Sequence, residues 1–106
     1  IKAVEGGALT CYRQVNDSDV LVLLELQDYK MVANDTIQRI CYDFNHISAV
    51  FSVNCLFRYL LFSKNNDMQE YLETMSKLGS HAGLVGYGEH YNNQFVNQSM
   101  TCVVFE

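Results

Sequence analysis

The chain of 106 residues contains no proline, so no residue imposes a strong break inside it. Basic residues are also few, since seven Lys and Arg against twelve Asp and Glu leave a formal charge of −5. Nucleic acids and anionic membranes are bound by clustered Lys and Arg, so we expect neither partner. Hydrophobic residues make up 49% of the chain, which is typical of a folded domain and not of a disordered segment.

Long apolar runs are absent as well. The longest are "VLVLL" at 20–24 and "YLLF" at 59–62, far below the roughly 20 residues that span a bilayer, so no membrane insertion is expected. No basic stretch leads into an apolar one, so we expect no signal peptide. The length predicts a single domain over residues 7–106, preceded by a leader or linker at 1–6, and derived from a longer protein.

The cysteines do not form a recognisable framework. They are scattered, with no CxxC and no histidine at metal-ligand spacing: Cys11, Cys41, Cys55 and Cys102. This pattern favours reduced, mostly buried thiols in a cytoplasmic protein. We therefore predict no metal and no cofactor.

Two strands are predicted near the start of the chain. Apolar and polar residues alternate over 8–15, and "NDSD" then separates this segment from "VLVLLELQ" at 20–27. An Asn-Asp-Ser turn between two strands predicts a hairpin. The continuous apolar run of the second segment is typical of a central strand covered on both faces.

Two helices are predicted from the spacing of apolar residues. In the first, Ile37, Ile40, Cys41 and Phe44 form one stripe, with Asp35 and Gln38 as a capping box and Asn45 at its end. In the second, "DMQEYLETMSKLGS" at 67–80 has an apolar stripe at helical spacing. Asp67 and Glu70 are its expected caps, and Gly79 is expected to end it.

The remaining segments predict further strands. Residues 47–53 have the pattern of a buried strand, whereas 55–62 fit either a continued strand or a short helix. "HAGLVGYGE" at 81–89 and "MTCVVFE" at 100–106 predict two more strands, separated by an amide-rich loop. The order strand, strand, helix, strand, short helix, helix, strand, strand predicts an α+β domain with one mixed or antiparallel sheet of about five strands, covered by helices.

The first candidate site lies where the 47–53 strand ends. Asn54 and Cys55 come there, and Arg58 follows three residues after Cys55. If a helix begins at this point, its unpaired N–H groups and the guanidinium suit a carboxylate or phosphate, and the same field favours a Cys55 thiolate. The alternative is that Arg58 pairs with a structural carboxylate and Cys55 is a small core residue.

The second candidate site is "GYGEH" at 86–90. Gly86 and Gly88 are two residues apart and would leave one face of a strand without side chains, while Tyr87 points the other way. Glu89 and His90 follow, but no paired carboxylate, activated serine or metal cluster supports acid and base catalysis. The neutral amides of "NNQFVNQS" fit recognition better than bond breaking, and a solvated hairpin loop is the alternative.

These two stretches resemble the C-terminal domain of FIST proteins. "FSVNCLFR" is similar to a Phe-x-Cys-x-x-Arg strand exit, and "AGLVGYGEHYNNQFVNQSMTCVVF" is similar to the closing motif of that domain. Tyr87, Gly88 and Glu89 match the Tyr-Gly-Glu core. Leu84 stands where the family has an aromatic residue, and Ser99 stands where threonine is usual.

The resemblance implies an intracellular, non-catalytic sensory domain that binds small ligands such as amino acids. It also implies two partners, the N-terminal portion of a FIST protein and an output signalling domain. The expected ligand-binding residues come from both candidate sites: Asn54, Cys55, Arg58, Tyr87, Gly88, Glu89 and Asn97.

Charge complementarity suggests how such a site would work. If the two strand ends are neighbours, Arg58 and Glu89 would hold a zwitterion between them, with amides of Asn92, Asn93 and Asn97 around it and Tyr87 or Tyr91 as an apolar wall. Three alternatives stay open: a structural Arg58–Glu89 ion pair, a homodimerising or partner-docking module without a small ligand, and a thiol enzyme that uses Cys55.

Overall fold

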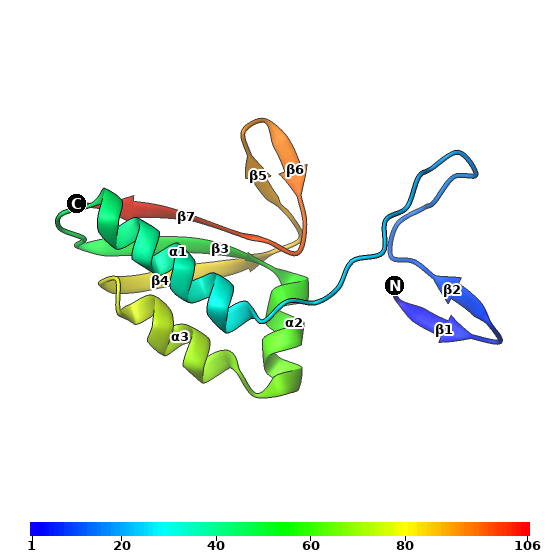
Figure 1. The fold of residues 1–106 in the computed structure, drawn as a ribbon, viewed down its shortest axis with the longest axis horizontal. Coiled ribbons are helices and arrows are strands. Elements are labelled where there is room, and N and C mark those ends of the chain that lie inside the picture. Colours follow the sequence, from blue (N-terminus) through cyan, green and yellow to red (C-terminus); the bar gives the residue numbers. More distant parts are fainter.

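The computed structural model describes all 106 residues and confirms an α+β fold. Its main sheet has three strands in the order β4-β3-β7 (Figure 1). The central strand β3 (Ala49–Cys55) is parallel to β4 (Ser80–Gly86) and antiparallel to β7 (Met100–Phe105). The prediction of a single sheet of about five strands is wrong, because the other strands form two separate hairpins.

Three helices pack on one face of this sheet: α1 (Tyr29–Asp43), α2 (Leu56–Asn65) and α3 (Met68–Ser76). Side chains alternate along β3, so that Val50 and every second residue after it point towards the helices. Val50 belongs to a cluster of five buried residues, which also contains Phe62, Tyr71, Met75 and Leu78. The Phe62 ring lies 4.6 Å from that of Tyr29 and 5.1 Å from that of Tyr71, measured between centroids.

The opposite face of the sheet carries no helix. Its apolar side chains are therefore well exposed: Phe51, Leu84, Val103 and Phe105. No helix of the structure combines the length and the apolar character needed to cross a membrane.

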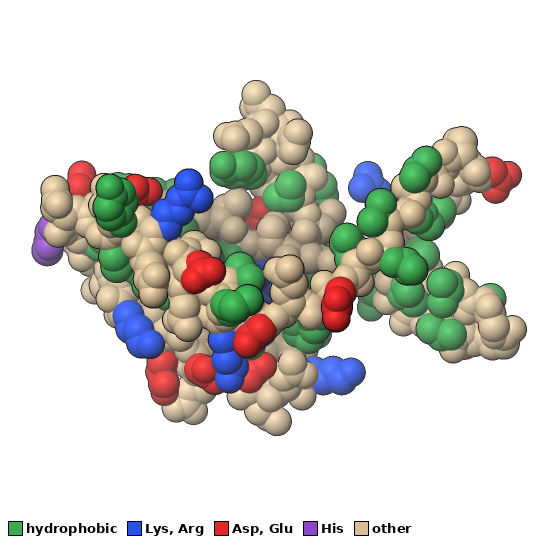
Figure 2. Space-filling view, viewed as in Figure 1, with side chains coloured by type: hydrophobic (Ala, Val, Ile, Leu, Met, Phe, Trp, Pro, Cys, Tyr) green, Lys and Arg blue, Asp and Glu red, His purple; other side chains and the backbone are tan.

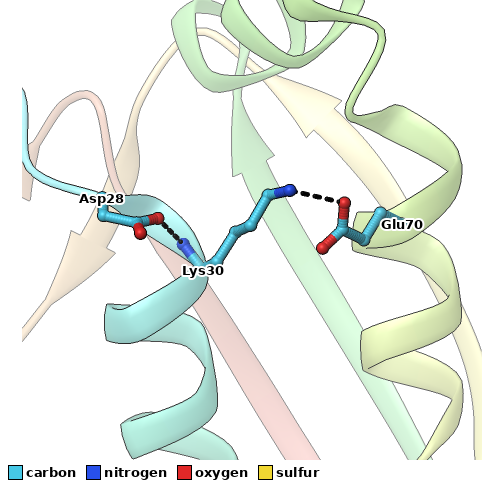
Figure 3. A network of polar contacts seen from close by, with 3 residues as sticks. All are labelled: Asp28, Lys30 and Glu70. Atoms are coloured by element: carbon cyan, nitrogen blue, oxygen red, sulfur yellow. Dashed lines mark hydrogen bonds and ion pairs between the residues drawn. The ribbon is translucent and has the colours of Figure 1, made fainter.

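Helix α1 begins about two turns before the predicted capping box. Asp28 caps it, since its carboxylate accepts a hydrogen bond from the Lys30 backbone N–H at 2.9 Å. The Lys30 side chain then forms an ion pair with Glu70 on α3, at 2.7 Å (Figure 3). The predicted capping box at Asp35 and Gln38 is wrong, because Asp28 caps the helix and residues 29–34 are already helical.

The segment after β3, which the sequence left undecided, is helix α2. It ends at Asn66, which adopts the left-handed conformation. Helix α3 has Asp67 at its N-cap as predicted, but the Asp67 side chain makes no capping hydrogen bond. Gly79 lies beyond the C-cap residue Lys77, with a positive φ of 138° just before β4.

The predicted N-terminal hairpin is wrong. The observed one joins β1 (Ala3–Glu5) to β2 (Ala8–Thr10) through Gly6 and Gly7, whose positive φ angles of 55° and 80° suit a two-residue turn. Residues 20–27 belong to no strand, although they were predicted to form a central one. Their apolar side chains are exposed, and Leu23 is 100% exposed. Figure 2 shows hydrophobic side chains gathered on the N-terminal part of the chain, which projects from the rest of the molecule.

The amide-rich segment forms a hairpin, which agrees with the alternative that the sequence left open. β5 (Glu89–Tyr91) pairs with β6 (Gln94–Val96), and Asn92 and Asn93 occupy the turn with positive φ angles of 46° and 63°. The strand predicted to continue to Glu89 ends at Gly86. In Figure 1 this hairpin stands at the end of the main sheet where β7 begins.

Candidate ligand-binding site

The two predicted strand ends are neighbours in the sheet. β3 and β4 are parallel, and Cys55 at the end of β3 is in register with Gly86 at the end of β4. Helix α2 begins directly after Cys55, which puts Arg58 in its first turn. Glu89 follows β4 by three residues and starts β5, which contacts β3. The fold thereby brings Arg58 and Glu89 to the same edge of the sheet, together with Asn54 and Cys55.

Arg58 is held by hydrogen bonding and stacking, not by an ion pair. Its Nε donates to Asn54 Oδ1 at 3.1 Å, and its guanidinium carbon lies 5.1 Å from the centroid of the Phe62 ring. Burial lowers the pKa of Arg58, against the opposing effect of nearby charges that include Glu89. No carboxylate lies within 4.0 Å of the guanidinium, so the structural Arg58–Glu89 ion pair is not formed.

Asn54 connects Arg58 to the core. The buried amide accepts from Arg58, and its Nδ2 donates to the Tyr71 hydroxyl oxygen at 2.5 Å. The Tyr71 hydroxyl in turn donates to the sulfur of Met100 at 3.2 Å. A continuous set of polar contacts therefore runs from α2 through β3 and α3 to the start of β7.

Glu89 is the most unusual side chain in this region, since its carboxyl group belongs to a residue that is only 2% exposed. The Ser99 hydroxyl donates to its Oε2 at 2.5 Å, whereas its Oε1 is buried and has no hydrogen-bond partner. The Cys55 backbone N–H donates to the Ser99 carbonyl oxygen at 3.0 Å, which ties this pair to the end of β3. An unsatisfied buried carboxylate oxygen is costly, and a ligand ammonium would satisfy it.

Three predicted site residues lie elsewhere. Tyr87 is 85% exposed, and Asn97 is exposed beyond the end of β6. Gly88 is outside any strand with φ of 149°, and a Cβ atom added there would overlap the ring of Phe95. The expectation of an empty glycine face is wrong because Phe95, from the chain's own hairpin, fills that space.

The other predicted contacts also fail to reach the cluster. Asn92 and Asn93 form the tip of the β5–β6 hairpin, and the Tyr91 side chain is exposed. Asn54, Cys55, Arg58 and Glu89 remain as the residues that the structure places together. Sequence reasoning gave little weight to Ser99, whose contact with Glu89 depends on the return of the chain after the hairpin.

An apolar cavity of about 240 Å³ lies beside this cluster, between β4 and helices α2 and α3. Asn54 lines it together with Ser52 and His81, whose Oγ and Nε2 atoms are 2.9 Å apart. Burial lowers the pKa of His81, so the ring is neutral at pH 7. The sequence indicated only that His81 flanks a strand; the Ser52 contact follows from the parallel pairing of β3 with β4.

The cysteines divide into two groups. Cys55 is 0% exposed and Cys102 is partly buried, and burial raises the pKa of the Cys102 thiol. Cys11 and Cys41 are exposed, so the prediction of mostly buried thiols is wrong for half of them. The chain has no group of three or more His, Cys, Asp or Glu side chains arranged to hold a metal ion.

Comparisons with protein-family models, with curated proteins and with solved structures find no match to this chain.

Proposed function

We propose that this chain is a non-catalytic small-ligand sensing domain of a cytoplasmic signal-transduction protein, and that its ligand is a zwitterion such as an amino acid. The resemblance to the FIST C-terminal domain supports this proposal, together with the meeting of its two motifs at one sheet edge. Arg58 would bind the ligand carboxylate, and Glu89 would bind the ammonium group. Their positions just beyond the carboxyl ends of adjacent parallel strands are typical of ligand sites in α/β sheets.

The observation that carries the proposal is the incomplete pairing of a buried carboxylate, Glu89, and a half-buried guanidinium, Arg58. Glu89 has one oxygen without a partner, and Arg58 uses only Nε in a hydrogen bond within the protein. An unpaired buried charge is costly, so a purely structural role would favour a direct contact between the two groups, and they are not joined. A ligand with both charges would satisfy both groups.

The contacts of Asn54 give a route by which binding would be transmitted. Arg58 holds one end of the Asn54 amide and Tyr71 of the core holds the other. A ligand that draws the guanidinium towards its carboxylate would weaken the Arg58–Asn54 bond and shift α2 relative to α3. An attached output domain would respond to the resulting change in the populations of the two arrangements of α2 and α3.

Calorimetric titration of the 106-residue chain with each of the twenty amino acids tests the proposal. We expect binding of at least one, and Arg58→Gln or Glu89→Gln should weaken it about thirtyfold or more, the loss expected for one partner of a buried charge pair. Lys64→Gln, in the last turn of the same helix α2, and Glu73→Gln, on the exposed surface of α3, are the matched controls.

Ligand analogues test the same site without changing the protein. If leucine binds, 3-methylbutylamine and 4-methylpentanoate each lack one of its two charges and should bind much more weakly. Binding that is unchanged in both variants, or equally strong for the singly charged analogues, would overturn the zwitterion site.

A second candidate function is homodimerisation without a small ligand. The uncovered apolar face of the main sheet favours it, since Phe51 of the central strand and Val103 of β7 are both exposed there. Sedimentation equilibrium without ligand distinguishes the two functions: a tight dimer that Val103→Lys dissociates would favour dimerisation, and a monomer would exclude it.

A further inference from the structure

The most exposed apolar segment of the chain is the apolar arm, which we define as residues 20–24, "VLVLL". All five side chains are exposed, and no strand pairs with their backbone. A continuous apolar surface of this kind marks an interaction site. We propose that the arm docks as a fourth strand on the free edge of β7 in its own chain, antiparallel to β7 and parallel to β3.

The topology selects β7 over the other free edge, that of β4. β3 continues through α2 and α3 to the parallel strand β4, and the helices lie on the same face of the sheet as α1. Crossovers between parallel strands are right-handed in almost all proteins. A strand that precedes α1 and runs parallel to β3 must therefore lie on the opposite side of β3 from β4, beyond β7.

The outer edge of β7 has backbone N–H and C=O groups that a further strand could pair with. The Cys55 N–H bonds to the Ser99 carbonyl oxygen, and hydrogen-bonded pairs recur at every second position of an antiparallel ladder. Thr101 and Val103 therefore bond to β3, whereas the N–H and C=O groups of Cys102 and Val104 face outwards. A docked arm would use these groups.

The connection to α1 is long enough. Residues 25–28 can span about 13 Å, against the roughly 10 Å that separate packed layers. Leu26 and Gln27 already line a hollow together with Gln98, two residues before β7. Asp28 and the Lys30–Glu70 ion pair fix the start of α1, so the movement is confined to residues before Asp28 (Figure 3).

Docking would also complete the cover of α1. This helix has 15 residues and none of them is buried, although Ile37 and Ile40 pack against the core. The three strands present leave the apolar stripe of α1 incompletely buried. A fourth strand beyond β7 would widen the sheet at its β7 edge and give this stripe a further surface to pack against.

Nuclear magnetic resonance of the full 106-residue chain tests the docking. We expect cross-strand proton contacts between the arm and β7, with residue 24 near Met100 and residue 20 near Phe105. Slow hydrogen exchange is expected for the Cys102 and Val104 amides. Val22→Pro should increase their exchange rates at least tenfold and leave that of Val103 unchanged, whereas Val15→Pro, at another exposed position, should change neither.

Two outcomes would overturn the proposal. One is fast exchange of Cys102 and Val104 in the unsubstituted protein without contacts to the arm. The other is contacts that form only between molecules, detected in an equal mixture of isotope-labelled and unlabelled chains, which would make a second copy the occupant. Neither result depends on whether the proline variants fold.

Discussion

Replacing Ser99 by Ala should destabilise the protein through the Glu89 carboxylate. The Ser99 hydroxyl provides the only hydrogen bond of that buried group, and its removal leaves both oxygens without a partner. Hydrogen bonds to charged groups contribute about 1.5–3 kcal/mol, so we expect a loss of about 2 kcal/mol in the free energy of unfolding. For a domain of this size the loss corresponds to a decrease in Tm of about 8 °C.

Urea unfolding and calorimetry measure this change. Ser76→Ala is the matched control, because the Ser76 hydroxyl donates only to the Leu72 carbonyl oxygen on the surface of α3 and its loss should change stability by less than about 0.5 kcal/mol. In a Glu89→Gln background the hydrogen bond is no longer charge-assisted, so Ser99→Ala should cost about half as much. A cost below about 0.5 kcal/mol in the unsubstituted protein, or an equal cost in both backgrounds, would refute the reasoning.

Two further predictions concern other parts of the site. The pKa of His81 is lowered in the folded state, so the unfolded chain binds a proton at this residue more strongly. Tm should therefore fall as the pH decreases below about 6.5, and it should fall more steeply in the unsubstituted protein than in His81→Gln. The control His46→Gln, at an exposed position, should behave like the unsubstituted protein. Equal acid sensitivity in all three would contradict this. Gly88→Ala should cost about 1–3 kcal/mol because of its positive φ and the close approach of the Phe95 ring. Gly86→Ala should cost less, because its Cβ would meet Val53 Cγ1 at 3.5 Å and the Gly88 carbonyl oxygen at 3.6 Å, both ordinary contacts. Equal losses of stability for the two variants in urea unfolding would count against this prediction.

The sequence predicted that Arg58 and Glu89 would come to one edge only if their two strands were neighbours, and the parallel pairing of β3 with β4 supplies that condition. It also predicted the Asn54 and Cys55 positions, which follow from the same strand. It did not predict the Glu89–Ser99 contact, since that depends on where the chain returns after the β5–β6 hairpin. Tertiary packing, not local pattern, decides such contacts.

The sequence contains a local indication of where α1 begins, the capping residue Asp28, but the spacing of apolar residues does not reveal it. Asp28 is a good capping residue, but the apolar spacing becomes regular only from Ile37, so the helix was placed too late. The glycines of "GYGEH" had a local signal of a different kind. A positive φ and the close approach of Phe95 both favour glycine at position 88.

The central proposal is that Arg58 and Glu89 bind the two opposite charges of a zwitterion, and thermal unfolding with amino acids tests it most directly. At a concentration of one hundred times Kd, a bound amino acid stabilises the folded state by about 2.7 kcal/mol, which raises Tm by about 10 °C. We expect such an increase for at least one of the twenty amino acids, and its loss in Glu89→Gln. A Tm that stays within about 1 °C for all twenty at 10 mM, where even a Kd near 10 mM would give a measurable increase, would contradict the claim.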